Sequence, residues 1–288
     1  MNRLVLPALV ALLLPSFAPA AEPLRALTYN IWQFGPLSRE NGPRLDALCT
    51  YLSAQVRLRR GHGLVFLQEA WGASARQRLR DCGYPYFADQ DSDVLPETGL
   101  MVLSRWPVLR QLKRDFAVNG RWSRVQDGEI LSAKGALFAL IDSPLGKVWV
   151  VDTHLIAQYD GEHYDHQRRA QLEELSVWVR ELQLEEPSAH WILGGDLNVA
   201  AVPLVLDEQA AAPLRADDWD AWVPTLFQQL PRAVLLENGT YVPANGWVRD
   251  TEPNDGQLDH LRSSASLCIS EGARAMICLL YTSDAADE

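Results

Sequence analysis

Short apolar runs recur along the chain with the length and composition of β-strands. They span residues 24–32, 63–70, 99–108, 134–142, 146–155, 190–196 and 257–263. Glycine, proline or polar residues separate them, and branched or aromatic side chains are frequent within them, which is typical of strands.

Two of the intervening segments have the apolar spacing of amphipathic helices, with charged residues on the other faces. The apolar positions are Leu172, Leu175, Val179 and Leu182 within residues 166–183, and Leu45, Leu48, Leu52 and Val56 between the first two strands. No Pro/Ser-rich linker, repeat or low-complexity tract interrupts the alternation. The pattern therefore predicts a single layered α/β domain.

Residues 1–20 have the features of a signal peptide. Arg3 precedes an apolar run over residues 4–14 that is too short to cross a bilayer, and small residues suited to cleavage follow it. We therefore expect a secreted or periplasmic protein. An uncleaved membrane anchor is the alternative.

The last stretch, CLLYTSDAADE at residues 278–288, resembles a translated sequencing adapter. On this interpretation the domain occupies residues 21–277 and is incomplete at its C-terminal end. The last strand of the fold is then truncated.

The composition supports one large domain and argues against one class of partner. Hydrophobic residues make up 48% of the chain, which is ample for a core, and the formal net charge is −11. An acidic surface disfavours binding to nucleic acid by bulk charge, although a metal site can neutralise phosphate locally. The sequence indicates no protein partner, and we expect a monomer.

Two cysteines, Cys49 and Cys82, lie well inside the expected domain. In an exported protein they could form a disulfide, and two free buried thiols are an equally good interpretation. No cysteine spacing suggests a zinc site.

Polar residues end most of the predicted strands. They are Asn30, Gln68 with Glu69, Asp152 with His154, Asp196 with Asn198, and Asp259 with His260. Singly, each could be a solvated carboxylate or a hydrogen-bonded core histidine. Together they form a set of acids, amides and imidazoles without a prominent serine or cysteine nucleophile, which suits a divalent metal that holds a phosphate and activates water.

The stretch HWILGGDLNVA brings two of these residues close together. Residues two apart in an extended segment point the same way, so Asp196 and Asn198 are predicted to face one spot, with Gly194 and Gly195 allowing a sharp turn where the chain leaves the sheet. The alternative is a turn in which the Asp and Asn side chains cap their own backbone.

Magnesium is the metal that these residue types favour, with Mn²⁺ or Co²⁺ as substitutes. Mg²⁺ is commonly held by one or two carboxylates plus substrate phosphate oxygens, and Glu69 is the predicted ligand. Asn30, Asn198 and a protonated His154 are predicted to donate to the phosphate oxygens. Asp196 is predicted to orient or deprotonate the attacking water.

Several of these segments resemble the motifs of the endonuclease/exonuclease/phosphatase superfamily. TYNIW, FLQEAW, DTHL and GGDLNVA occur in the family's order and spacing within residues 24–263. The resemblance implies a four-layer α/β sandwich of the deoxyribonuclease type, with two packed mixed β-sheets flanked by helices. It also implies magnesium-dependent cleavage of phosphate esters.

Within this superfamily the chain is most similar to the secreted bacterial neutral sphingomyelinases. The segments that carry the likeness are AKGALFALID, VVDTHLIAQYD and TYVPANGWV followed by QLDHL, in which His260 replaces a more usual tyrosine. The family also ends in a Ser-Asp-His motif whose histidine is oriented by the aspartate placed here at Asp259. Because no such histidine follows, we expect the printed chain to be poorly active and less stable than its natural parent.

Four functions remain open at this point. The first is a secreted magnesium-dependent phosphodiesterase acting on sphingomyelin or a related phospholipid at a membrane surface, where Trp219, Trp222 and Phe227 either contact lipid or belong to a core helix. The second is an exported nuclease with nucleic acid as substrate. The others are a phosphomonoesterase on sugar or inositol phosphates, and a catalytically dead protein that binds a phosphate ligand.

Overall fold

The computed structural model describes residues 24–33, 41–58, 61–90, 97–119, 133–157, 164–198, 232–233 and 259–263, the last two segments by their backbone alone. The predicted signal peptide, the adapter-like tail and the aromatic segment at 217–227 lie outside these residues. Among the described residues, no helix has the length and apolar character needed to cross a bilayer.

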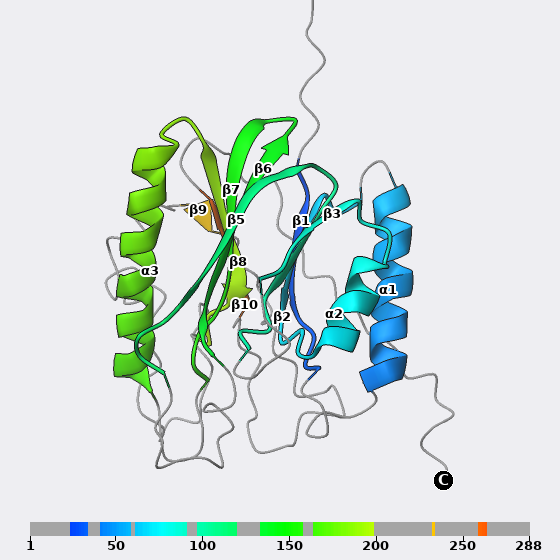
Figure 1. The fold of residues 1–288 in the computed structure, drawn as a ribbon, viewed down its shortest axis with the longest axis horizontal. Helices are drawn as coiled ribbons and strands as arrows, with labels where there is room; N and C mark the ends of the chain where they lie inside the picture. The colour runs from blue at the N-terminus through cyan, green and yellow to red at the C-terminus, as the bar shows by residue number, and fades with distance from the viewer. Residues whose placement is uncertain are drawn as a thin grey trace, which may run out of the picture.

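The described residues form two mixed β-sheets with helices outside each, as Figure 1 shows. The four-stranded sheet has the order β1 (Ala26–Asn30), β2 (Leu64–Gln68), β4 (Met101–Ser104), β3 (Tyr86–Ala88). The six-stranded sheet has the order β5 (Val108–Asp115), β6 (Gly135–Ser143), β7 (Gly146–His154), β8 (His190–Asp196), β10 (Asp259–Ser263), β9 (Arg232–Ala233). Helices α1 (Asn41–Arg57) and α2 (Ala73–Arg80) flank the first sheet, and α3 (Asp165–Glu185) flanks the second. The predicted four-layer α/β sandwich is confirmed.

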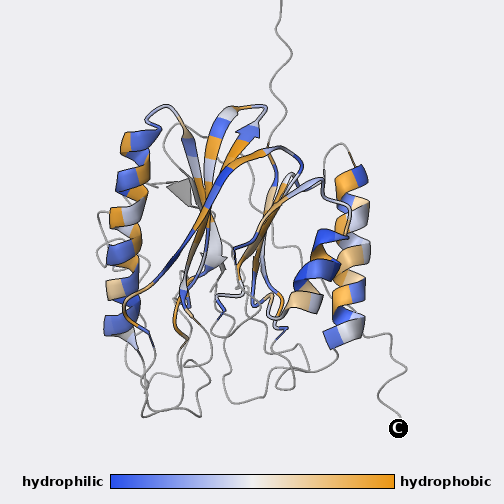
Figure 2. Ribbon diagram, viewed as in Figure 1, coloured by the Kyte–Doolittle hydropathy of each residue, from blue (hydrophilic) through white to orange (hydrophobic). Residues whose placement is uncertain are grey.

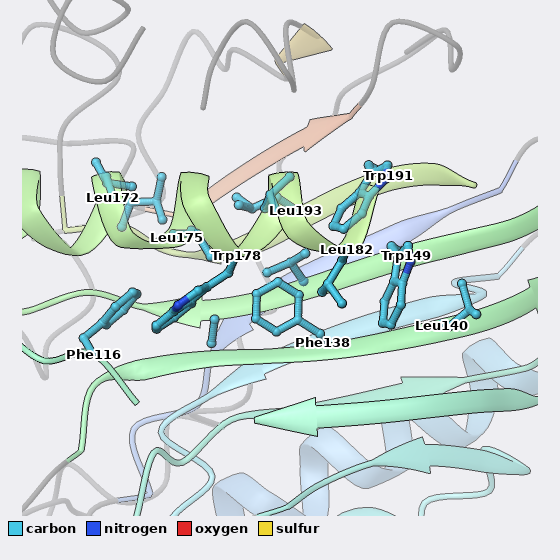
Figure 3. Close-up of a cluster of buried hydrophobic side chains, with 14 of the residues drawn as sticks. Phe116, Phe138, Leu140, Trp149, Leu172, Leu175, Trp178, Leu182, Trp191 and Leu193 are labelled. Atoms are coloured by element: carbon cyan, nitrogen blue, oxygen red, sulfur yellow. The ribbon is translucent and has the colours of Figure 1, made fainter. Parts of the chain in front are cut away.

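Three apolar layers hold the sandwich together. The layer between the sheets contains Phe66, Val102, Val150 and Ile192, and the layer under α1 and α2 contains Leu48, Leu52, Leu79 and Met101. Under α3, Trp178 stacks on Phe116 with ring centroids 5.1 Å apart, beside Phe138 and Leu182 (Figure 3). Apolar and polar residues alternate along α1 and α3 in Figure 2 because only one face of each helix is buried.

The chain passes between sheets inside one predicted strand. The run at residues 99–108 was expected to be a single strand, but β4 ends at Ser104 and β5 begins at Val108 in the other sheet. Pro107 lies at the crossing and has no N–H for a ladder bond. Helix α2 had no apolar period to predict it, because its buried residues are Ala75, Arg76 and Leu79.

The two glycines in β8 allow neighbouring parts of the structure to pack closely against the strand, and they do not form a turn. The expectation that Gly194 and Gly195 mark a turn is wrong, since the strand continues to Asp196. A Cβ on Gly194 would lie 2.6 Å from Cγ of Phe66 in the opposing sheet, and one on Gly195 would lie 2.1 Å from the Thr153 carbonyl oxygen. A side chain at position 194 would push the two sheets apart, and one at position 195 would push β8 away from β7.

Of the two interpretations of the cysteines, a disulfide or two free thiols, the structure has the disulfide. Cys49 of α1 and Cys82, just after α2, form a disulfide across 33 residues of sequence. Both residues are buried in the layer beneath α1 and α2. The bond ties the two helices of this layer together.

Candidate active site

The predicted strand-end residues gather at one end of the sandwich. Asn30 ends β1, His154 ends β7, Asp196 ends β8, and Glu69 directly follows β2. The parallel pairs bring these ends together, because His154 is in register with Asp196 and Asn30 is in register with Gln68, the residue before Glu69. Each sheet therefore contributes side chains to the same region.

Asn30 joins the two sheets at this end. Its Nδ2 donates to Glu69 Oε1 at 2.8 Å and to Asp196 Oδ2 at 3.0 Å. Its Oδ1 accepts from the Trp32 backbone N–H at 3.0 Å, which fixes the orientation of the amide. Two carboxylates from different sheets are thus held on either side of one amide nitrogen.

Left-handed backbone is concentrated in the same region. Trp32, Glu69 and Asn198 have φ angles of 47°, 58° and 50°, which are unfavourable for residues other than glycine. At Glu69 the segment that follows β1 contacts this backbone, because the Glu69 carbonyl accepts from the Gln33 N–H at 3.1 Å. Such conformations persist where the surrounding structure determines them and are frequent at functional sites.

Asp196 and Asn198 approach each other by a different route from the one predicted. The strand ends at Asp196 and Asn198 is left-handed, so strand alternation does not govern the pair. Instead, the Asn198 N–H donates to Asp196 Oδ1 at 3.0 Å, and Asn198 Nδ2 donates to the Leu155 carbonyl at 2.9 Å. The backbone-capping turn considered from the sequence is therefore present, and it leaves Asp196 Oδ2 directed at Asn30.

His154 lies beside a buried lysine that sequence reasoning did not single out. Lys134 Nζ is 3.5 Å from Nδ1 and 3.4 Å from Nε2 of His154, and both side chains are about 3% exposed. Burial and the charge of Lys134 hold the pKa of His154 well below its usual value. In the protein without ligand, both effects disfavour the protonated form of His154 that was expected from the sequence.

The position of Lys134 follows from the β6–β7 hairpin. Gly135 is in register with His154, so the residue before Gly135 lies next to the histidine. A lysine at the start of an otherwise apolar strand was the sequence signal that could have identified it. The charge it brings is suited to a phosphate.

The carboxylate oxygens of Glu69 and Asp196 are of the kind that magnesium ions prefer. The described residues contain no cluster of three or more His, Cys, Asp or Glu side chains that could hold a metal. Glu69 is nevertheless partly exposed, and burial raises the pKa of its carboxyl, while the charge of Lys134 and the Asn30 hydrogen bond oppose this shift. The carboxylates of Glu69 and Asp196 match the one or two carboxylates with which proteins commonly hold Mg²⁺.

A second buried polar pair lies directly beneath these residues. Gln68 Nε2 donates to Asp152 Oδ1 at 2.6 Å, and neither side chain is exposed to solvent. Burial raises the pKa of Asp152 well above its usual value, although the Gln68 hydrogen bond opposes this. Asp152, named from the sequence only as a strand-end residue, therefore links the sheets beneath the site.

Asp259 is placed only by its backbone. It begins β10 and is in register with Asp196 on the neighbouring antiparallel strand. This brings the predicted catalytic aspartate to the same end of the sheet as His154. The direction of its side chain lies outside what the structure describes.

Comparisons with known proteins agree with this arrangement. The chain matches the profile of the Endonuclease/Exonuclease/phosphatase family over residues 27–261. A putative neutral sphingomyelinase from Drosophila melanogaster is 31% identical over 180 residues, which are 61% of this chain and 39% of that protein. The chain therefore spans less than two thirds of the length of this relative.

The fold is shared with solved structures, of which two are relevant to the site. Sphingomyelinase C from Streptomyces griseocarneus has a TM-score of 0.61 at 20% identity, with 85% of each chain covered. A mutant beta toxin from Staphylococcus aureus with bound magnesium ions has a TM-score of 0.61 at 16% identity, with 83% of each chain covered.

The two-sheet sandwich with acids, amides and a histidine at one end defines a phosphoesterase-type α/β scaffold. This chain belongs to the endonuclease/exonuclease/phosphatase family.

Proposed function

We propose that the chain is an exported, magnesium-dependent phosphodiesterase that hydrolyses sphingomyelin or a related phospholipid at a membrane surface. The observation that carries the proposal is the Asn30 amide, which joins Glu69 and Asp196 from two sheets beside His154 and Lys134. The named sphingomyelinases among the relatives support the choice of substrate. The signal-like residues 1–20 support export to the periplasm or the medium.

The two sides of the site have different roles in this proposal. Glu69 would hold the magnesium ion, and Asn30 keeps its carboxylate in place through the 2.8 Å hydrogen bond. When bound, the ion supplies positive charge to the phosphate oxygens and acidifies a coordinated water. Lys134 and His154, from the other sheet, stabilise the negative charge that develops as water attacks the phosphorus in line.

Asp196 is the proposed base. As a carboxylate, it accepts from Asn30 through one oxygen and from the Asn198 N–H through the other, so its orientation is fixed before a water arrives. Asn198 sets this orientation through its backbone, and the N–H of its side chain that does not donate to the Leu155 carbonyl is proposed to contact the phosphate. Asp259 is proposed to orient the catalytic histidine that the family resemblance implies.

The test compares substrates on one preparation. The protein, expressed from its gene as cloned from genomic DNA, is assayed on sphingomyelin liposomes and on plasmid DNA, with Mg²⁺ and with EDTA. We expect Mg²⁺-dependent release of phosphocholine and intact plasmid. Nicked plasmid with untouched liposomes would assign the same chemistry to a nuclease, and inactivity on both with retained phosphate binding would indicate a binding protein.

A further inference from the structure

A buried ion network lies next to the loop that carries Glu69. Glu97 Oε2 is 2.6 Å from Arg76 Nη1, and Arg76 Nε is 3.3 Å from Asp89 Oδ2, which also pairs with Arg80 at 2.7 Å. The side chains of Arg76, Glu97 and Asp89 are 1%, 4% and 0% exposed. Removing such charges from water costs free energy, and their mutual attraction offsets this cost only where the pairs are well aligned and hydrogen-bonded.

The network reaches the loop through its backbone. Helix α2 begins after Gly72, which has no side chain to cap the helix, and Glu97 Oε2 accepts the Gly72 N–H at 2.9 Å instead. The same short segment also holds the two preceding residues. The Gly99 carbonyl accepts the Ala70 N–H at 2.8 Å, and the Trp71 ring packs so closely on Gly99 that a Cβ there would lie 2.9 Å from it.

From these contacts we infer that Glu97 is a positioning residue for Glu69. Residues 97–99 contact every residue between Glu69 and α2, and Glu97 fixes the end of that loop. These contacts, which we call the anchor, hold Glu69 in its left-handed backbone conformation, φ 58°, and so fix the position of its carboxylate. Arg76 in turn holds the Glu97 carboxylate in place. The inference rests on the proposed metal role of Glu69.

Two double variants of equal charge test the anchor. Both remove the buried charges of the pair, but Arg76→Met/Glu97→Gln keeps an oxygen acceptor for the Gly72 N–H, whereas Arg76→Met/Glu97→Leu does not. Binding of Mn²⁺ is measured by titration calorimetry without substrate. We expect the Gln variant to bind within about twofold of the parent and the Leu variant about tenfold more weakly, as for other groups that orient a metal ligand.

A stability control separates positioning from loss of folding. Leu79→Ala loosens α2 through the apolar layer, where Leu79 is fully buried, without removing the Glu97 contact to Gly72. We expect it to lower the Tm and leave the Mn²⁺ affinity unchanged. Equal affinities in the two double variants, or an equal loss of affinity in Leu79→Ala, would overturn the positioning role.

The variant Glu69→Gln distinguishes this inference from the proposed function. Mn²⁺ binding that is lost in Glu69→Gln but equal in both double variants contradicts the positioning role alone. Binding that is unaffected by Glu69→Gln contradicts the proposed metal site and the inference together.

Discussion

The two ends of the sandwich differ in their chemistry and in their backbone. At the site end, Trp32, Glu69 and Asn198 are left-handed, and Lys134 and His154 are buried side by side. At the opposite end, β6 and β7 are joined by a short turn at a left-handed glycine, Gly146, and the exposed side chains include Tyr86, Phe87 and Leu109. Unfavourable backbone and buried charge are tolerated at the site end because the apolar layers determine the fold independently.

The largest expected effect is on catalysis. Asp196→Asn removes the proposed base while preserving the shape of the side chain, so kcat should fall about 10³-fold. Because the new amide accepts through one atom only, either the Asn30 or the Asn198 donor loses its acceptor, and the free energy of unfolding should fall by about 1–3 kcal/mol. The matched control is Asp142→Asn, the same change at the exposed far end of β6, which should leave kcat unaltered. Steady-state assays and urea denaturation measure both quantities. Retention of most activity in Asp196→Asn would exclude Asp196 as the base.

The next effect is confined to stability. Cys49→Ala/Cys82→Ala opens the disulfide and should lower the free energy of unfolding by about 3 kcal/mol. Because the bond ties α1 to the chain after α2 and contacts none of the proposed catalytic residues, kcat should stay within about twofold of the parent. A large loss of kcat in the folded variant would show that the two regions are coupled.

A change in the layer between the sheets should affect both the free energy of unfolding and kcat. Gly194→Ala places a Cβ against Phe66 and should cost about 1–3 kcal/mol in unfolding free energy. It should also lower kcat, because Asp196 lies two residues further along the same strand. Gly42→Ala in α1 is the control, since a Cβ there meets nothing within 4 Å and should be neutral or slightly stabilising.

The smallest expected effect is a gain in stability that depends on pH. Burial raises the pKa of Asp152, so the folded protein keeps this proton at pH values where the unfolded chain has lost it. The free energy of unfolding therefore falls as pH rises from the ordinary pKa to the raised one. Asp152→Asn removes this titration and allows donation to Gln68 Oε1, which has no other partner.

We expect Asp152→Asn to be about 1 kcal/mol more stable than the parent at pH 7 and no more stable near pH 3. Urea denaturation over this pH range measures the difference. A constant difference at every pH would show that Asp152 does not titrate between these limits.

Much of the fold followed from the apolar pattern. The strands at β1, β2, β6, β7 and β8 and the helices α1 and α3 were predicted within a few residues, because each buries a regular apolar face. The failures were β4 with β5, taken as one strand, the short strands β3 and β9, which were not predicted, and α2, whose buried Arg76 is paired with Glu97. A buried charge satisfied by a distant residue leaves no local pattern.

The chemistry of the site was only partly accessible from the sequence. Asn30, Glu69, His154 and Asp196 could be named because each ends or follows a strand, and the structure brings them together. The roles assigned to them remain predictions. Lys134 was missed, because its importance depends on burial and on its position beside His154 across the hairpin. The same burial and the charge of Lys134 disfavour the protonated His154 that was expected.

The sequence by itself determined the layered α/β architecture, the family and the residue types at the strand ends, because these depend on local periodicity and short motifs. Only the tertiary structure decided that Asn30 joins carboxylates from two sheets, that Cys49 pairs with Cys82, and that Glu97 anchors the Glu69 loop. These features depend on distances between residues far apart in the chain, and those distances are set when the sheets pack together.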